Sequence, residues 1–303
     1  MAPQLQPVLR AHARGVRPGV PRTLPAEKPV SLPAGRVPCV WVVASHRELG
    51  NEHGHPQKYT VMDEAGTRTL VNLGLQPVCF PRVPAGRLGL MLDMVDGVLL
   101  GGSATNVHPR HYGEEPLHEG MCFDEGRDVV ALPLVRLAIE RGIPLIGFCR
   151  GSHDINVGLG GSMHQSLQAL GGPVVHWEDP NETLDEQYQE RHEVTCVPGG
   201  ALERLTGCSR FAVSSLHSQG VKRLAPGLVA EAVADDGLIE ASRWYDERQF
   251  AWAFQFHPEW GHQQHPRYAR IMAAYVDACW ARLSSRAMAP AGPDPAIVLP
   301  EVA

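Results

Sequence analysis

The amino-acid sequence predicts an α/β fold in which helices flank a mostly parallel sheet. Up to residue 100, apolar runs of strand type alternate with stretches of helical spacing. This order is typical of parallel strands joined by crossover helices. A further strand-type run over 143–148 ends at a cysteine, and a helical pattern follows it directly. Shorter β-type runs and one amphipathic helix complete the pattern.

A single domain accounts for most of the 303 residues. Residues 1–36 hold six basic side chains and one acidic one among many prolines, which predicts a disordered basic extension. The domain is expected over 37–284 and an Ala/Pro-rich disordered tail over 285–303. The N-terminal segment lacks the apolar core of a secretory signal, and no apolar run is long enough to span a membrane.

The first half of the domain is expected to hold three strands and two helices. Residues Val37–Ala44 are rich in β-branched side chains and suit a buried strand. Residues 57–75 place apolar side chains at helical spacing, with Gly74 near the end, which favours a helix. The other expected elements are a polar loop at 45–56, a strand at 77–80, a weak helix at 86–93, a strand at 96–100 and a long polar loop at 103–125.

The second half begins with an amphipathic helix over 127–141, in which Pro133 predicts a late start or a kink. A strand at 143–148 and a helix at 152–159 enclose the cysteine. Residues 170–192 are polar and loop-like, with a helical pattern at 186–191. The elements expected after this loop are strands at 193–197, 211–215, 228–233, 239–242 and 250–256, and a helix that begins at Pro266.

The segment Gly147-Phe148-Cys149-Arg150-Gly151 has the sequence form of a nucleophile elbow. In such a turn the backbone bends so sharply that only glycine fits on either side, and the nucleophile is exposed at the carboxyl end of a strand. On its own, Gly-x-Cys-x-Gly is a weak motif that also suits an inert buried thiol.

A reactive cysteine needs a base, because the thiolate is the nucleophile. His257 has the best context among the 15 histidines, since it follows an apolar strand and precedes Pro258. Glu259 stands two residues beyond, where it can accept a hydrogen bond from the imidazole as the third member of a triad does. Cys149, His257 and Glu259 are therefore expected together at the carboxyl edge of the sheet, where ligands bind in open α/β folds.

The oxyanion of a tetrahedral intermediate needs backbone donors. The residue after the nucleophile, Arg150, provides one N–H in elbow enzymes. Gly101 and Gly102 follow the strand at 96–100 and can bring a second amide close, because they have no Cβ. Each motif alone is also explained by an ordinary turn, and their joint occurrence after predicted strands favours an active site.

Together these motifs resemble those of the class I glutamine amidotransferases, which have a flavodoxin-like α/β fold. More narrowly, the chain is similar to the γ-glutamyl-γ-aminobutyrate hydrolase family, the free-standing peptidase C26-type γ-glutamyl hydrolases. The similarity runs in order from about Val37 to Leu283. The segments that carry it are 99–107 (LLGGSATNV), 126–128 (GRD), 147–151 (GFCRG), 160–164 (GGSMH), 215–220 (SLHSQG) and 256–260 (FHPEW).

This resemblance implies roles for individual residues. Cys149 is the implied nucleophile, His257 the general base and Glu259 its orienting partner. The loop at Gly101 reads Pro-Gly-Ser or Gly-Gly-Xaa in the family, so the backbone donor is retained here. Segment 215–219 matches the one that faces the substrate pocket. The implied binders are Ser215, His217 and Gln219 for the γ-glutamyl group and Arg150 for the substrate α-carboxylate, the alternative being that they only hold loops together.

The implied activity is cleavage of the γ-glutamyl amide of a small amine, such as γ-glutamyl-γ-aminobutyrate or a γ-glutamyl polyamine, in polyamine catabolism. One alternative is a glutamine amidotransferase subunit that supplies ammonia to a synthetase, although no synthetase domain fits in 303 residues. A second is a non-catalytic binding module on the same fold, which the complete triad argues against.

No cofactor or metal is expected. His108, His111 and His118 share a loop, and His262 and His265 have i, i+3 spacing, but neither group is a complete ligand set. Acidic loop residues are expected either to favour a cationic amine at the pocket mouth or to be solvated charges. These residues are Glu114, Glu115, Glu119, Glu178, Asp179 and Glu182.

The expected partner is therefore a small-molecule γ-glutamyl substrate. The net charge of −6 argues against nucleic acid or an anionic membrane. The seven cysteines lie singly with no CxxC pair, which fits a reducing cytoplasm. The sequence leaves a homodimer open.

Overall fold

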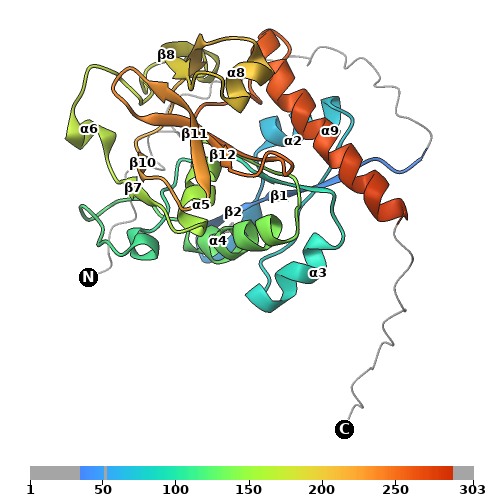
Figure 1. The fold of residues 1–303 in the computed structure, drawn as a ribbon. Coiled ribbons are helices and arrows are strands. Elements are labelled where there is room, and N and C mark those ends of the chain that lie inside the picture. Colours follow the sequence, from blue (N-terminus) through green and yellow to red (C-terminus); the bar gives the residue numbers. More distant parts are fainter. Residues whose placement is uncertain (1–34, 51–52, 289–303) are drawn as a thin grey trace, which may run out of the picture. The chain divides into compact units, whose positions relative to one another are not determined.

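The computed structural model describes residues 35–50 and 53–288, which fall in the compact unit Pro33–Ala303. Its main sheet has nine strands in the order β4-β1-β5-β6-β13-β12-β11-β8-β9 (Figure 1). The strands are β1 Cys39–Val43, β4 Gln76–Val78, β5 Gly97–Leu100, β6 Leu145–Phe148, β8 Glu190–Cys196, β9 Arg210–Ser214, β11 Leu228–Ala234, β12 Ile239–Trp244 and β13 Ala251–Phe254.

The sheet has a parallel half and an antiparallel half. Strands β4, β1, β5, β6 and β13 pair in parallel. Strands β13, β12, β11, β8 and β9 pair antiparallel. The predicted α/β fold is confirmed, and the predicted strands lie where the sequence placed them. Since the parallel strands end at one edge, loops from far apart in the chain meet there.

Helices cover both faces of the sheet. The α-helices of the described residues are α2 Glu64–Asn72, α3 Leu88–Leu92, α4 Glu125–Glu140, α5 Arg150–Gly158, α6 Leu167–Leu170, α7 Leu184–Gln187, α8 Ala201–Thr206 and α9 Pro266–Met288. No helix in the described ranges is long and apolar enough to cross a membrane.

Alternate residues of each strand point to opposite faces, which creates two apolar cores. Val40 and Val42 of β1 pack with Ile271 and Tyr275 of α9, the red helix of Figure 1. Side chains from the opposite face pack with α3, α4 and α5. That second core includes Trp41, Val43, Val98, Leu100, Leu145, Leu88, Val130, Leu134 and Ile155.

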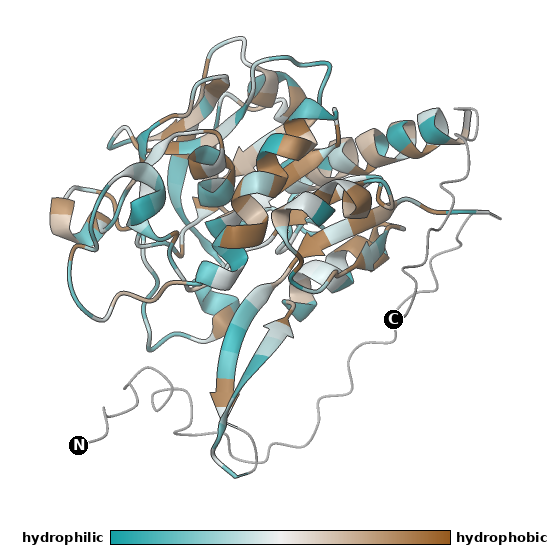
Figure 2. Ribbon diagram, turned by 90° about the horizontal axis from the view of Figure 1, so that it is seen from below, coloured by the Kyte–Doolittle hydropathy of each residue, from teal (hydrophilic) through white to brown (hydrophobic). Residues whose placement is uncertain are grey.

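A β-hairpin replaces the loop predicted at 45–56 and the first part of the helix predicted at 57–75. Strands β2 Ser45–Gly50 and β3 Pro56–Val61 pair antiparallel outside the main sheet, as a largely teal ribbon in Figure 2. Their side chains are mostly exposed, so they have no period-2 apolar pattern that would reveal a strand. Helix α2 starts later because Asp63 is its N-cap, accepting hydrogen bonds from the amides of Ala65 and Gly66.

Other element boundaries also differ from the sequence prediction. Helix α4 begins at Glu125 and includes Pro133, so the predicted late start is wrong. Its first turn is capped by Asp124, whose carboxylate accepts from the Arg127 amide at 2.9 Å. The short elements β7 Ser162–His164 and β10 Gly220–Arg223, which pair with each other, and helices α6 and α8 were not predicted.

The predicted terminal segments lie almost entirely outside the described residues. Residues 35–36 and 285–288 are the exceptions, and 285–288 belong to α9 rather than to a tail. The last helix of the described residues therefore continues past the domain boundary expected at 284.

The elbow between β6 and α5 depends on two glycines for space. A Cβ on Gly147 would lie 2.6 Å from the carbonyl oxygen of Gly151. One on Gly151 would lie 1.8 Å from the carbonyl oxygen of Leu100 in β5. Neither glycine has a positive φ, so close backbone approach alone excludes larger residues here.

Replacing Gly151 by alanine should therefore unfold the elbow region. Because the obstructing atoms are backbone, we expect a loss of at least about 3 kcal/mol in the free energy of unfolding. Urea denaturation followed by circular dichroism measures this loss. Gly86→Ala is the control, since a Cβ there has no atom within 4 Å, and its midpoint should not change. Equal midpoints for the two variants would contradict the packing argument.

Candidate active site

Cys149 lies where strand β6 ends and helix α5 begins. Its φ of 47° makes it the one non-glycine residue with positive φ in the described ranges. Such a conformation costs roughly 1–3 kcal/mol and is concentrated at functional sites. The backbone amide donates to the carbonyl of Phe254 in β13 at 2.8 Å, which ties the turn to the next strand. The predicted elbow is thus formed, with the thiol at the carboxyl edge of the sheet.

The thiol faces a cavity of about 400 Å³. His257 and Glu259, from the segment after β13, line the same cavity, as do Gly101 and Gly102. The structure therefore brings together the residues predicted as nucleophile, base, orienting acid and oxyanion loop. A larger cavity, of about 510 Å³, opens at the amino ends of β6 and β13, and none of these residues lines it.

His257 and Glu259 form a buried pair. His257 Nδ1 lies 2.7 Å from Glu259 Oε1, and the two side chains are 5% and 9% exposed. Burial alone would lower the pKa of His257, but the Glu259 carboxylate outweighs it, with smaller contributions from Tyr188 and Cys149, and holds the pKa well above its usual value. The carboxylate also fixes the ring so that Nε2 is free to exchange a proton.

A tyrosine to which the sequence assigned no role covers the histidine and is itself covered by Trp260. Tyr188, which follows α7, contacts the His257 ring edge-on with centroids 4.9 Å apart. Trp260 stacks on Tyr188 at 4.1 Å. Tyr188 lies in the stretch 170–192, where the helical pattern at 186–191 does not mark it as part of a site. Its ring lines the cavity and limits the access of water to His257.

The Gly101–Gly102 peptide is oriented by a buried arginine. Arg127 of α4 donates to the Gly101 carbonyl oxygen at 2.6 Å. In a trans peptide the N–H points opposite to the carbonyl, so the Gly102 amide is directed away from Arg127. Gly102 also lies directly against His257, because a Cβ there would be 2.8 Å from the ring carbon Cε1. Arg127 was named from the sequence only as part of the resemblance, without a role.

Beneath the elbow lies a buried ionic network of two arginines and two aspartates. Arg127 Nε donates to Asp154 Oδ2 at 2.9 Å, and Arg150 Nη2 donates to Asp128 Oδ1 at 2.5 Å. Arg150 also pairs with Asp154 through Nη1. Each of the four side chains is at most 1% exposed. The network joins α4 and α5 under the nucleophile.

This placement contradicts the role predicted for the Arg150 side chain. Its guanidinium is held by Asp128 and Asp154 and lines neither cavity at Cys149, so it is not available for a substrate carboxylate. The elbow motif predicted the position of Arg150 in the fold but not the direction of its side chain. The Arg150 backbone amide stays at the helix start, where the elbow prediction put it.

A second cavity, of about 270 Å³, also opens at Cys149. His217 and Gln219 line it, together with Trp177 and Glu178. Ser215, in contrast, is turned away and donates from Oγ to the carbonyl of His176 at 3.0 Å. Two of the three predicted γ-glutamyl binders therefore face a cavity at the thiol, and Ser215 holds a loop.

Of the six acidic loop residues, Glu178 alone lines these two cavities. Glu114 pairs with Lys222 at 2.7 Å, and Glu182 pairs with Arg191. Both of these carboxylates are thus engaged in surface ion pairs, and Glu178 is the one of the six that faces the space at Cys149.

The chain is similar to known proteins of one enzyme family. The peptidase C26 family model matches residues 38–259. The γ-glutamyl-γ-aminobutyrate hydrolase PuuD of Escherichia coli is 34% identical over 245 residues, which cover 80% of this chain and 93% of that protein. The glutamine amidotransferase-like protein YvdE of Lactococcus lactis is 32% identical over 62% of this chain and 76% of its own length.

Among solved structures, a GMP synthase-type protein of Thermoplasma acidophilum has a TM-score of 0.53 at 18% identity, covering 84% of this chain and 99% of its own. This likeness confirms the fold of the class I glutamine amidotransferase type.

Removing one charge from the buried network should destabilise the protein strongly. In Asp154→Asn, Arg127 and Arg150 lose their shared carboxylate without loss of side-chain volume. We expect the free energy of unfolding to fall by about 3–5 kcal/mol, because an arginine charge is left buried without its partner. Urea unfolding measures this, with Glu64→Gln as control, since Glu64 pairs with Arg68 on the surface. A loss no larger than that of the control would refute this account of the network.

Proposed function

The chain belongs to the peptidase C26 family, and from that premise we propose that it is a cysteine hydrolase that cleaves the γ-glutamyl amide of a small γ-glutamyl amine, such as γ-glutamyl-γ-aminobutyrate or a γ-glutamyl polyamine. The observation that carries the proposal is the shared cavity of Cys149, the His257–Glu259 pair and the Gly101–Gly102 loop. A role in polyamine catabolism in the cytoplasm is part of the proposal. The seven free cysteines support that location.

Acylation begins when His257 takes the proton of the Cys149 thiol. The sulfur attacks the γ-carbonyl carbon of the substrate and forms a tetrahedral intermediate. His257 then gives its proton to the leaving nitrogen, the carbon–nitrogen bond breaks, and a neutral amine departs from a γ-glutamyl thioester. The Glu259 carboxylate, 2.7 Å from His257 Nδ1, orients and stabilises the imidazolium.

Deacylation repeats these steps with water. His257 removes a proton from a water molecule, whose oxygen attacks the thioester carbonyl. The thiolate leaves, takes the proton back, and free glutamate is released. The oxyanion of both intermediates is within the reach of two backbone donors, the Gly102 amide opposite Arg127 and the Arg150 amide at the start of α5. Such donors are each worth roughly 10²–10³-fold in kcat.

The γ-glutamyl end and the amine end of the substrate need separate space at Cys149. The two cavities that meet there supply it, one lined by the triad and one by His217, Gln219 and Glu178. Glu178 is a carboxylate at the rim, so it favours a cationic amine over one that carries a carboxylate. Because Glu178 is exposed, the preference is modest.

The alternative function is release of ammonia from glutamine for a partner synthetase, which the similarity to YvdE favours. Both reactions start with attack of a cysteine on a γ-glutamyl carbonyl, so the triad does not distinguish them. Ammonia release from glutamine that rises when a synthetase is added would favour this alternative.

A hydrolysis panel over γ-glutamyl-γ-aminobutyrate, γ-glutamyl-putrescine, γ-glutamyl-spermidine and glutamine tests the proposal. We expect the γ-glutamyl amines to exceed glutamine in kcat/KM, and Cys149→Ala to lose at least about 10³-fold. Cys122→Ser is the matched control, because Cys122 is exposed and outside both cavities. Glu178→Gln should reduce the preference for polyamine over γ-aminobutyrate conjugates a few-fold. Full activity of Cys149→Ala would exclude the mechanism.

Glu259→Gln should change the pH dependence of kcat/KM. The proton that His257 takes from Cys149 must stay on the imidazole until the amine is released, so kcat/KM falls as the pH rises through the pKa at which this imidazolium loses its proton. The carboxylate is the main group that raises this pKa against burial, so its removal lowers the pKa and moves the alkaline limb to lower pH. We also expect kcat to fall by roughly 10²-fold or more. An alkaline limb that stays in place, as it should in Glu64→Gln, would argue against the pairing.

A further inference from the structure

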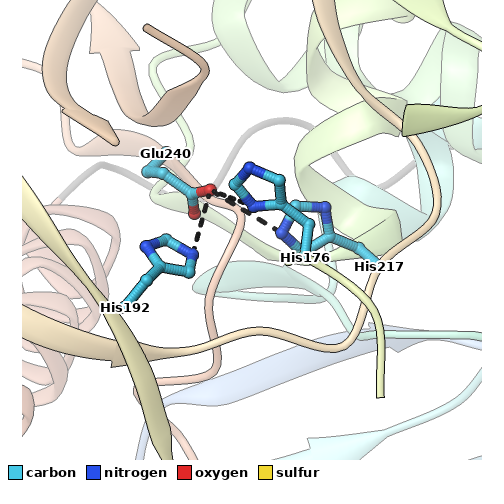
Figure 3. A group of neighbouring side chains, drawn as sticks. All are labelled: His176, His192, His217 and Glu240. Carbon is cyan, nitrogen blue, oxygen red and sulfur yellow. Dashed lines mark ion pairs between the residues drawn. The ribbon is translucent and has the colours of Figure 1, made fainter. Parts of the chain in front are cut away.

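Outside the triad, four titratable side chains converge in the antiparallel half of the fold. His176 comes from the loop before α7, His192 from β8, His217 from the segment after β9, and Glu240 from β12. Figure 3 shows the three imidazoles directed at the Glu240 carboxylate. Glu240, His176 and His217 are 1%, 2% and 4% exposed, and one ligand atom from each of the four lies within 4.8 Å of the others.

The tautomer of each imidazole is set by an oxygen on its outer side. Carboxylate and carbonyl oxygens only accept hydrogen bonds, so the outer nitrogen of each ring must carry the proton. In the neutral imidazole, the form that binds a metal, the inner nitrogen then carries a lone pair. The three outer contacts are His176 Nε2 to Asp236 Oδ2 at 2.8 Å, His217 Nδ1 to the Gln219 carbonyl at 2.8 Å, and His192 Nδ1 to the Glu193 carbonyl at 3.2 Å.

The inner nitrogens and the Glu240 oxygens have no proton to donate to one another in a hydrogen bond. His176 Nδ1, His192 Nε2 and both oxygens of Glu240 have no hydrogen-bond partner among the described residues. His217 Nε2 lies 3.2 Å from Ser215 Oγ, whose hydrogen is directed at the carbonyl of His176. Lone pairs that converge on a buried carboxylate repel it, and each unsatisfied polar atom is costly. A cation at the centre removes both problems.

The spacing also suits a metal better than hydrogen bonds. The three inner nitrogens lie 3.4, 3.6 and 3.7 Å from Glu240 Oε1, beyond ordinary hydrogen-bond length. Ligands bound tetrahedrally at 2.0–2.2 Å are separated by about 3.3–3.6 Å. Three imidazoles and one carboxylate are ligands of zinc and similar divalent transition metals, whereas calcium and magnesium prefer all-oxygen sites. The Asp236–His176 contact is the carboxylate–histidine support common at such sites.

We propose that His176, His192, His217 and Glu240 bind one divalent transition metal ion of the zinc type. All four ligands come from the protein, so the site is closed and structural, and the ion takes no part in the hydrolysis. His192, the most exposed of the four with 10% of its side chain accessible, marks the side from which the ion enters.

The ion would hold a wall of the active site in place. It joins strands β8 and β12 to His217, the neighbour of Leu216. The Leu216 carbonyl lies 3.9 Å from Cys149 Sγ, and Leu216 lines both cavities. In this assignment His217 positions segment 215–219, which revises its predicted role as a binder of the γ-glutamyl group.

Metal content tests the proposal without reference to any substrate, so its outcome is separate from that of the hydrolysis panel. The purified full chain is incubated with Zn²⁺, desalted and measured by inductively coupled plasma mass spectrometry. We expect one zinc per chain, a rise in Tm on loading, and loss of the zinc in His192→Gln and Glu240→Gln. His118→Gln is the control, since His118 is exposed in a loop outside the cluster, and it should bind zinc like the parent.

A second readout uses Co²⁺. Tetrahedral nitrogen and oxygen ligation should give visible d–d absorption that is absent in His192→Gln. Should Glu240→Gln fail to fold, His192→Gln decides, because its side chain lies at the rim and circular dichroism verifies its fold. A parent protein that retains neither zinc nor cobalt overturns the proposal, and so does a folded His192→Gln variant with one tightly bound zinc.

Discussion

The active site depends on how closely helix α5 approaches strand β5. At Gly151 the helix backbone runs against the carbonyl of Leu100, and a Cβ would lie 1.8 Å from that oxygen. This contact sets the start of α5 beside the end of β5. Cys149 and the Gly101–Gly102 loop can therefore face one cavity, although they are almost 50 positions apart. The left-handed backbone of Cys149 follows, because the chain must reverse direction within a single residue to bring the helix so near.

Packing alone would not hold this strained turn in one position. The buried ionic network adds contacts whose geometry is directional. Arg127 contacts both the Gly101 carbonyl and Asp154 on α5, so one side chain couples the Gly101–Gly102 loop to the helix that follows Cys149. Buried ion pairs contribute little net stability, since desolvation offsets their attraction. Their strict geometry makes them suited to fixing the relative position of two loops.

The strands and the elbow could be predicted from the sequence because burial imposes a pattern on them. Apolar runs mark the central strands, and Gly147 and Gly151 mark the turn. Side-chain direction has no such signature, which is why Arg150 was assigned to the substrate although it points into the ionic network. The β2–β3 hairpin was not predicted, because neither of its strands has a buried face that would give an apolar pattern. The residues of the histidine cluster span 176–240, and only the antiparallel pairing of β8, β11 and β12 brings them together.

The parallel and antiparallel halves of the sheet position different residues of the site. Parallel strands β5, β6 and β13 end beside the candidate active site. Their order in the sheet fixes the relative positions of Cys149, His257 and the Gly101–Gly102 loop. The antiparallel half lies further along the same edge and delivers segment 215–219 and the loop around Glu178. In the proposed function the first step is common to γ-glutamyl hydrolysis and to glutamine-dependent ammonia release, so the two reactions would differ in the residues around the leaving group, Glu178 among them. Leu216 lines both cavities and lies beside the Cys149 thiol. Holding segment 215–219 rigidly in place would therefore affect which substrates the site accepts.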